Sequence, residues 1–338
     1  PAQALARELQ EQLGECKILF LAKGLQNNSC FSKTDFSFVD ISASPISSLR
    51  ACINIPRGIW QSTMAMRQFA PDLVVGFGSY HTFPVLCAAT MTRVPMVLHV
   101  ADCIPGRVNK LFSGRALFTG TFFPEAKAYL KGTVCQSQIP LRAQFYPPLR
   151  PSREAAHARY GFSAHKKTVL VFGGSQGASK LNQLVSAALH DSLQVLHFTG
   201  SQSDPEEIKA AYARGSVTAV VQRFEHEMQY AWAAADLVIT RAGASTIAEQ
   251  LAFGVPGILI PYPYAMDQHQ DKNARFVEDV VGGARRLPEQ GLTSERLAVE
   301  IDRLLEEAIY KKMQAALTQA QADIAELQFS KQILKVLG

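Results

Sequence analysis

The chain has 338 residues, of which 47% are apolar and 19% are charged, with 34 Lys and Arg against 29 Asp and Glu. A chain of this length and composition can bury two cores of ordinary domain size, which excludes wholesale disorder. The net charge of +5 is a mild excess. It suits contact with phosphorylated molecules or an anionic membrane surface, but no Lys/Arg block is dense enough to predict a nucleic-acid partner.

The cysteines and the start of the chain exclude several further classes. The six cysteines all lie in the first 135 residues without a C-x-x-C pair, so we expect reduced thiols and neither a zinc site nor a disulfide framework. No run of about 18 apolar residues predicts a membrane span, and no signal peptide precedes the first helix. That helix is predicted at once, over 1–13. Since a helix in an α/β protein normally follows a strand and a turn, we expect a strand and its loop to be missing upstream.

Short apolar runs bounded by Gly, Pro and polar residues suit parallel strands that are buried on both faces. In the first part of the chain these runs are 17–22, 72–76, 96–100 and 133–135. Helix-like segments lie between them, for example 56–69 and 84–91. This alternation predicts a doubly wound α/β sheet.

After a proline-rich stretch at 143–167, interpreted as a linker and a short helix, the alternation restarts. Asp204-Pro205 is a typical helix start, and 309–337 has one long amphipathic helical pattern. The predicted strands of this part are 168–172, 195–199, 217–221, 236–240 and 255–260. We therefore predict an N-terminal domain at 1–142, a second α/β domain at 143–308, and a C-terminal helix at 309–338 that packs back on the first domain.

The most informative motif is a strand that runs into a glycine-rich turn and then a helix, at 171–182, with the turn Gly173-Gly-Ser-Gln-Gly-Ala178. Glycines let a backbone approach a ligand closely, and the amides and dipole of a helix start attract phosphate. The motif is neither a Walker A sequence nor G-x-G-x-x-G. An ordinary tight turn is the alternative.

A second motif, 240–250, again follows a strand and opens a helix. Glu249 lies three residues after Thr246, which matches a capping box. Alternatively, the Glu249 carboxylate accepts hydrogen bonds from two sugar hydroxyls while the loop amides contact a diphosphate.

A third polar loop, 261–274, follows the next strand, and its Gln, Asp and His side chains suit a sugar. Asp267 as a helix cap is the alternative. Because the carboxyl ends of parallel strands meet at one edge, the three loops are expected to converge there.

Three segments together resemble the signature blocks of the MurG family: Gly173–Ala178 with Asn182, Gly243-Ala-x-Thr246-x-x-Glu249, and Asp267-x-x-Gln270-x-x-Asn273-Ala274. The resemblance covers essentially the whole chain. It implies a GT-B fold of two Rossmann-like domains that face a cleft, and inverting transfer of N-acetylglucosamine from UDP-N-acetylglucosamine to lipid I, without a metal or other cofactor. The chain also holds no D-x-D pair for a metal-bound diphosphate.

The resemblance also implies which residues bind the donor. Arg142 is expected to steady the diphosphate, with Arg150 as a second candidate, and Glu249 is expected to bind the ribose hydroxyls. Phe224 and Glu225 match positions that flank the uracil through backbone atoms. The other implied donor contacts are Ser175, Gln176, Ala244, Ser245, Thr246, His269 and Gln270.

On the acceptor side, the segment from Gly76 to Pro84 resembles the family's second glycine loop. His99-Val-Ala-Asp102 falls where the family has His-Glu-Gln-Asn, and a buried, satisfied His99 is the alternative to an acceptor contact. Asp102, His81 and the histidine of the family's first glycine loop are candidates for the general base. That first loop would lie upstream of Pro1, so we expect a chain poorly folded in this domain or inactive. The implied acceptor-loop residues are Gly76, Gly78, Ser79, Tyr80 and His99.

The proposed reaction is a direct displacement at the anomeric carbon, with helix starts and Arg142 stabilising the departing UDP. A polyprenyl acceptor implies a peripheral enzyme on the cytoplasmic face of the bacterial inner membrane. Segments 50–60 and 110–115 interleave bases with large apolar residues, as at a bilayer interface. An amphipathic helix packed on its own sheet is the alternative for them.

Three rival functions remain compatible with the same motifs. A diacylglycerol glycosyltransferase or a UDP-sugar epimerase would share the nucleotide-binding half. A non-catalytic UDP-sugar-binding protein is favoured by the Val100-Ala101 departure from the family pattern.

Overall fold

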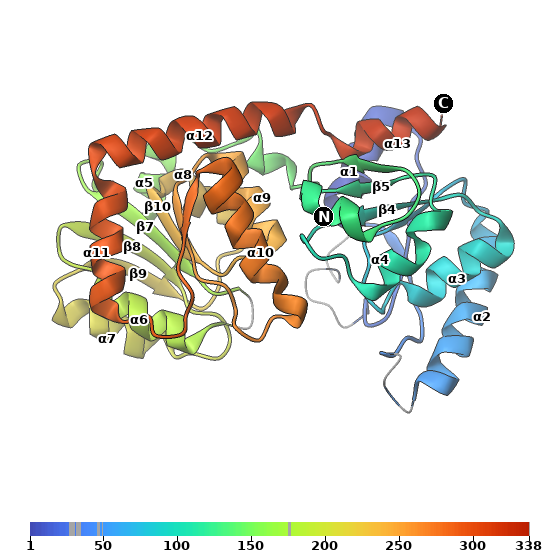
Figure 1. Ribbon diagram of the computed structural model, residues 1–338, viewed down its shortest axis with the longest axis horizontal. Coiled ribbons are helices and arrows are strands. Elements are labelled where there is room, and N and C mark those ends of the chain that lie inside the picture. The colour runs from blue at the N-terminus through green and yellow to red at the C-terminus, as the bar shows by residue number, and fades with distance from the viewer. Residues whose placement is uncertain (27–30, 32–34, 46–47, 49, 175–176, 338) are drawn as a thin grey trace. The chain divides into compact units, whose positions relative to one another are not determined.

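The computed structural model describes residues 1–26, 31, 35–45, 48, 50–174 and 177–337. They form two compact α/β units, one made of Pro1–Pro140 with Leu327–Gly338 and the other of Leu141–Glu326 (Figure 1). No helix in these ranges is long and apolar enough to cross a membrane.

The second unit contains a sheet of parallel strands in the order β12-β11-β10-β7-β8-β9. The order runs outward in both directions from the central pair β7 and β10, so the chain reverses its direction of winding between these two strands. Ligands of such sheets bind outside the carboxyl ends of the strands at this switch point. The strands are β7 (Lys167–Phe172), β8 (Leu193–Phe198), β9 (Thr218–Gln222), β10 (Leu237–Thr240), β11 (Gly257–Leu259) and β12 (Ala284–Arg286).

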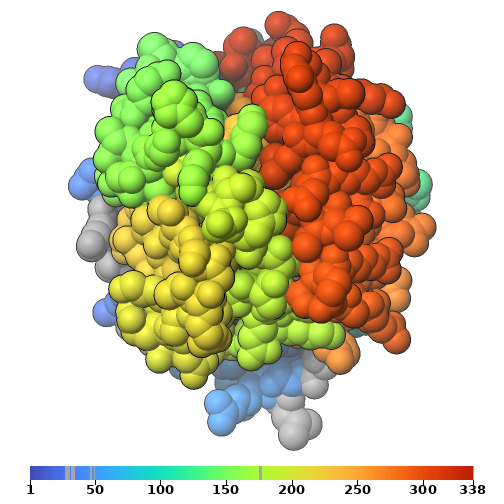
Figure 2. All heavy atoms as spheres, turned by 90° about the vertical axis from the view of Figure 1, so that its left-hand side faces the viewer, coloured from blue at the N-terminus to red at the C-terminus, as the bar shows by residue number. Residues whose placement is uncertain are grey.

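Helices cover both faces of this sheet. Val169 and Val171 of β7 share a core with α6, α7 and α11. Figure 2 shows the outer surface of these three helices. Phe172 follows Val171 and so points to the other face, where its ring meets Trp232 of α8. The helices are α5 (Arg153–Tyr160), α6 (Ser179–Ala188), α7 (Pro205–Arg214), α8 (Met228–Ala234), α9 (Ala244–Phe253), α10 (His269–Arg275), α11 (Ser294–Leu305) and α12 (Glu307–Ala325), with the short turns η3 (Ala143–Phe145), η4 (Met266–Gln268) and η5 (Phe276–Val281).

The first unit has two parallel sheets, β1-β2 and β3-β4-β5-β6. Its strands are β1 (Leu19–Ala22), β2 (Ser37–Asp40), β3 (Val74–Gly76), β4 (Met96–Val100), β5 (Thr119–Thr121) and β6 (Val134–Gln136). Its helices are α1 (Ala2–Leu13), α2 (Ala51–Phe69), α3 (Phe83–Thr92), α4 (Arg107–Phe112) and α13 (Phe329–Leu337), with the turns η1 (Ser113–Arg115) and η2 (Pro124–Tyr129).

The C-terminal segment is divided between the units. The long helix α12 ends at Ala325, and α13 begins at Phe329 after a short break. Phe329 and Ile333 are fully buried in a cluster with Leu5 of α1 and Val97 of β4. The last helix is therefore an integral part of the first unit's core.

Candidate functional site

The glycine-rich turn lies at the end of β7, at the switch point of the second unit. Gly174 and Gly177 have φ of 95° and 85°, and Gly200 in the turn after β8 has φ of 76°. A Cβ on Gly200 would lie 2.4 Å from the backbone N and Cα of Gly177. The two turns therefore touch backbone to backbone, which only glycine permits. Ser175 and Gln176 lie outside the described residues.

Asn182 stabilises the contact between these two turns. Its side-chain amide donates to the Thr199 carbonyl at 3.0 Å and to Ser203 Oγ at 2.9 Å, while its Oδ1 lies 3.1 Å from Nε2 of His197. Asn182 and His197 are fully buried. Asn182 thus fixes the turn after β8 against the glycine turn, a structural role for a residue of the signature block.

The helices that follow the two central strands begin without a side-chain cap. α6 starts after Ala178 and α9 after Gly243, and no described side chain accepts a hydrogen bond from either N-terminus. In α5, α7 and α11 the side chains of Ser152, Asp204 and Thr293 do so. Backbone N–H groups at the starts of α6 and α9 therefore have no described side-chain acceptor, and at the switch point of the sheet such groups suit an anion. Ala244 is buried at the start of α9, with Thr246 half-buried and Ser245 exposed.

The capping-box alternative for Glu249 is wrong. Since α9 begins at Ala244, Thr246 lies inside the helix and cannot be its cap. The carboxylate instead accepts a hydrogen bond at Oε2 from the indole N–H of Trp232, at 2.9 Å. Burial raises the pKa of Glu249, whereas the Trp232 bond and the nearby charge of Arg142 lower it. Glu249 thus lies in the second turn of α9, and its carboxylate binds Trp232 rather than an N–H group at the helix start.

The two arginine candidates differ in what they bind. Arg142 is exposed, donates to the His226 carbonyl at 3.1 Å and lies close enough to act on Glu249. Arg150 donates to the carbonyls of Phe145 and Ala252 and packs over the Phe253 ring. The Arg150 guanidinium thus links the segment that precedes α5 with helix α9. Because Arg150 is engaged in this way, Arg142 is the arginine better suited to bind a diphosphate.

Phe224 and Glu225 lie in the turn after β9 and line a hollow of about 380 Å³. Phe224 is 45% exposed. The Glu225 carboxylate accepts from the Tyr160 hydroxyl and from the Glu227 N–H. Since that side chain is engaged within the protein, a ligand at this turn would meet the backbone of Glu225 and the ring of Phe224.

The polar side chains of the third loop bind the loop to itself and to the second loop. Gln270 Oε1 accepts from the Tyr262 N–H at 2.9 Å, and Asn273 donates to the Ala242 carbonyl at 3.1 Å. His269 is bound at Nδ1 to the Met266 carbonyl. The alternative of Asp267 as a helix cap is wrong, because α10 begins after Gln268 and has no side-chain cap.

Arg241 and Glu289 join these loops, and the sequence interpretation gave neither a role. The buried Arg241 guanidinium pairs with Glu289 and donates to the carbonyls of Ile260 and Pro261 at 3.2 Å each. Glu289 also lies 3.7 Å from Lys180 Nζ of α6. The sequence feature that could have pointed to Arg241 is a single charged residue directly after a buried strand, in Thr240-Arg241-Ala242.

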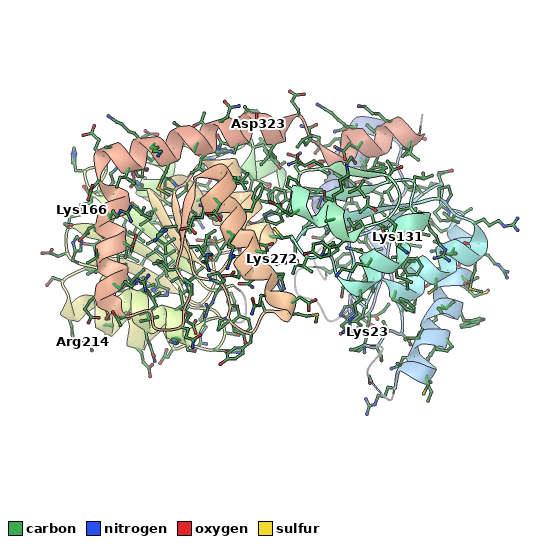
Figure 3. The ribbon with its side chains drawn as sticks, in the orientation of Figure 1. Lys23, Lys131, Lys166, Arg214, Lys272 and Asp323 are labelled. Carbon is green, nitrogen blue, oxygen red and sulfur yellow. The ribbon has the colours of Figure 1, made fainter. Side chains whose placement is uncertain are left out.

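In the first unit, the loop after β3 contains two consecutive left-handed residues, Gly78 and Ser79, with φ of 80° and 75°. His81 in this loop is half-buried and stacks on Tyr80, with ring centroids 4.0 Å apart. Its Nδ1 is buried without a hydrogen-bond partner among the described residues. Burial and the charge of Lys23, labelled in Figure 3, lower the pKa of His81. Both effects favour the neutral imidazole.

His99 matches the alternative of a buried, satisfied histidine. It is 1% exposed on β4, its Nε2 lies 3.0 Å from the Gln138 carbonyl, and its ring packs on Phe329. Because a carbonyl only accepts, Nε2 carries the proton. Burial lowers the pKa of His99 to about 4. Asp102 lies half-buried in the loop between β4 and α4.

Stability is expected to depend on pH through His99. The pKa of about 4 in the folded protein lies below the 6.5 of the ordinary side chain, so the unfolded chain binds the proton first as pH falls. The contribution of the neutral His99 to the free energy of unfolding is fully present above pH 6.5 and is lost as the pH falls towards 4. It amounts to roughly 3 kcal/mol. His99→Gln keeps a donor to Gln138 but cannot titrate, and urea unfolding should show a correspondingly shallower pH dependence. Parallel curves for the two proteins would contradict this.

Two parallel α/β units, one with uncapped helix starts at its switch point, fit the class of GT-B glycosyltransferases. Family models agree: the glycosyltransferase family 28 N-terminal domain matches residues 1–119 and the C-terminal domain residues 168–328. The chain belongs to the family of UDP-N-acetylglucosamine–N-acetylmuramyl-(pentapeptide) pyrophosphoryl-undecaprenol N-acetylglucosamine transferases, as the following relatives show.

The enzyme of this name from Protochlamydia amoebophila (strain UWE25) is 42% identical over 94% of this chain and 87% of its own length. That from Chlamydia felis (strain Fe/C-56) is 34% identical over 89% of this chain and 85% of its own. The crystal structure of Acinetobacter baumannii MurG has a TM-score of 0.77 at 26% identity, covering 99% of this chain and 94% of that one. The predicted fold and family are thus confirmed.

Proposed function

We propose that the protein transfers N-acetylglucosamine from UDP-N-acetylglucosamine to the muramyl 4-hydroxyl of undecaprenyl-pyrophosphoryl-MurNAc-pentapeptide, with inversion at the anomeric carbon. The observation that carries the proposal is the switch point of the second unit. There the uncapped starts of α6 and α9 lie at neighbouring strand ends, and α9 also carries Glu249. Oriented amides for a diphosphate and a carboxylate for hydroxyls are what a nucleoside diphosphate sugar requires.

Charge develops on the departing UDP as the glycosidic bond breaks. The amides at the two helix starts stabilise that charge, and Arg142 adds a cation near Glu249. Ser175, Gln176, Ala244, Ser245 and Thr246 contribute the surrounding contacts, Phe224 and Glu225 flank the uracil, and His269 and Gln270 bind the sugar.

The acceptor hydroxyl must lose a proton as it attacks. We assign this proton to His81 or Asp102, in the loops after β3 and β4. The neutral imidazole of His81, with its unpartnered Nδ1, supports the first assignment. His99 is excluded as a base, because its ring is enclosed by Phe77 and Phe329 and its N–H is engaged by Gln138.

Because the acceptor carries a lipid, the enzyme needs a surface that binds a membrane. Helix α2 has a suitable one. Ile53 and Trp60 are 69% and 65% exposed, and Met64 is 48% exposed. With the exposed Arg57 and Arg67 they recur at helical spacing along one stripe. The buried side of α2 consists of Ala51, Gly58, Ser62 and Met66.

The alternative that α2 packs its large apolar residues on its own sheet does not hold for Ile53 and Trp60. In the second segment Leu111 is 53% exposed, but Phe112 is 4% exposed and belongs to the core. The proposed association with a membrane surface therefore rests mainly on α2, whose cations attract anionic lipid and whose apolar side chains enter the interface. The cytoplasmic face of the inner membrane is what the family resemblance implies.

Replacing both Ile53 and Trp60 with serine is expected to weaken binding to phosphatidylglycerol vesicles at least about tenfold, since each large apolar side chain contributes roughly 1.5–3 kcal/mol when buried. Val299→Ser is the matched control, because Val299 is 66% exposed on α11 of the other unit. Vesicle co-sedimentation measures both. Equal binding by the double variant and the control would contradict the assignment.

The function is tested by incubating the protein with labelled UDP-N-acetylglucosamine and a lipid I analogue. Transfer to the analogue supports the proposal, and transfer to diacylglycerol instead would replace it with the lipid glycosyltransferase. Conversion of the donor to its epimer, without transfer, would indicate a UDP-sugar epimerase. UDP binding without any turnover would indicate a nucleotide-sugar-binding protein.

A further inference from the structure

The Trp232 side chain is the one direct partner of the Glu249 carboxylate within the described residues, and nothing in the sequence motifs points to it. The indole Nε1–H donates to Oε2 at 2.9 Å across 17 residues of chain. Trp232 is 1% exposed on α8, whereas Glu249 is partly exposed on α9. The bond therefore joins a buried, fixed donor to an acceptor that a ligand can reach.

Two elements hold the indole in place. Its ring stacks on Phe253, at the end of α9, with centroids 6.2 Å apart and planes 20° apart. Phe172, the last residue of β7 before the glycine turn, meets the indole edge to face at 5.7 Å and 88°. Held by Phe253 and Phe172, Trp232 cannot turn its N–H away from Glu249 without disturbing the packing at the switch point.

A carboxylate oxygen accepts hydrogen bonds at two lone-pair positions, and a carboxylate held by one fixed donor has fewer orientations to lose when it binds a ligand. With Oε2 engaged by Trp232, Oε1 and one lone pair of Oε2 remain as acceptors for a ligand. Two adjacent acceptors match a pair of vicinal hydroxyls, which a ribose presents.

We propose that Trp232 is a positioning residue that orients the Glu249 carboxylate to accept hydrogen bonds from the 2′- and 3′-hydroxyls of the donor's ribose. This inference rests on the proposed function, because it takes UDP as the nucleotide bound at the switch point. Trp232 acts through Glu249 and does not itself touch the nucleotide.

The first test compares the affinities of Trp232→Phe for UDP and for 2′,3′-dideoxyuridine diphosphate by calorimetry. Phenylalanine keeps an aromatic ring but removes the donor. UDP affinity is expected to fall about tenfold and affinity for the dideoxy nucleotide less than about twofold. An equal loss for both nucleotides would overturn the inference in favour of a merely structural role, as would no loss for either.

Glu249→Ala supplies the matched background. If Trp232 acts only through Glu249, then adding Trp232→Phe to Glu249→Ala changes UDP affinity no further. Losses that simply add would overturn the inference. UDP binding by the wild-type protein separates a failure of the proposed function from a failure of the inference about Trp232. If UDP does not bind at all, both fail. If UDP binds with an affinity that does not depend on Trp232, only the inference is overturned.

A second measurement needs no Trp232 variant and so remains decisive if that variant does not fold. The chain has two tryptophans, so ¹⁵N-indole labelling gives two Nε1–H signals, with the exposed Trp60 as internal reference. Glu249→Gln and saturation with UDP are each expected to shift the Trp232 signal and leave the Trp60 signal unchanged. A Trp232 signal that responds to neither would overturn the inference.

Discussion

Replacing Gly200 with alanine is expected to abolish UDP binding, with a loss of at least about a hundredfold in affinity. The new Cβ would lie 2.4 Å from the backbone of Gly177, a distance that forces the two turns apart. The left-handed φ of 76° at Gly200 adds a cost of roughly 1–2 kcal/mol. Because the glycine turn opens α6, its displacement would move the helix-start amides that we propose as the ligands of the diphosphate.

Gly161→Ala is the matched control for this substitution. Gly161 has a similar φ of 68° at the end of α5, but a Cβ added there would meet no atom within 4 Å. Gly161→Ala therefore has the energetic cost of a left-handed φ but no steric clash. Calorimetric titration with UDP should show near wild-type affinity for Gly161→Ala and no measurable binding for Gly200→Ala. Similar affinities for the two variants would show that the close approach of the turns is irrelevant to the donor site.

Glu289→Ala is expected to destabilise the second unit by about 3–5 kcal/mol, because it leaves the buried guanidinium of Arg241 without its anion. The same change would release Arg241 from the carbonyls of Ile260 and Pro261 and loosen the start of the third loop. Urea unfolding followed by Trp232 fluorescence in a Trp60→Phe background reports on this unit alone.

The control for Glu289→Ala is Glu307→Ala, which removes the partner of Lys311. That ion pair has side chains 82% and 71% exposed, so its loss should change stability by less than about 1 kcal/mol. Replacing Arg241 and Glu289 together by Met and Leu should restore part of what Glu289→Ala loses. Comparable unfolding midpoints for Glu289→Ala and Glu307→Ala would contradict the assignment of a buried, loop-joining ion pair.

The elements that could be predicted from sequence are those with a continuous apolar core. β7, β8 and β10 are buried along nearly all of their length, and their apolar runs predict them to within one or two residues. The missed strands lack that signal. β2 (Ser37–Asp40) is exposed at every residue, and β5 (Thr119–Thr121) is a buried Thr-Gly-Thr.

The start of α2 shows a different limit. The sequence predicts a helix that begins at Pro56, a residue typical of a first helical turn, but α2 begins at Ala51 and contains Pro56. Pro56 is the sixth residue of α2, where the missing N–H removes one i→i−4 hydrogen bond, but the helix continues through it. A proline therefore need not mark the start of a helix.

Site residues in the strand-end loops were within reach of sequence reasoning, because loops after parallel strands converge at one edge. The partners of those residues were not. Trp232 reaches Glu249, Arg241 reaches Glu289 and Asn182 reaches His197 from separate elements. Such pairs depend on the tertiary placement of α8, of the segment after β12 and of β8, and no local spacing encodes them. For the same reason the capping box at Glu249 matched in sequence and failed in structure, where α9 begins before Thr246.

The most direct test of the account is a crystal structure of the protein with UDP. We predict that the diphosphate lies within hydrogen-bonding distance of the backbone amides at the starts of α6 and α9, with the ribose hydroxyls on the Glu249 carboxylate. A nucleotide bound away from these helix starts, with Glu249 still occupied by Trp232 alone, would contradict the account.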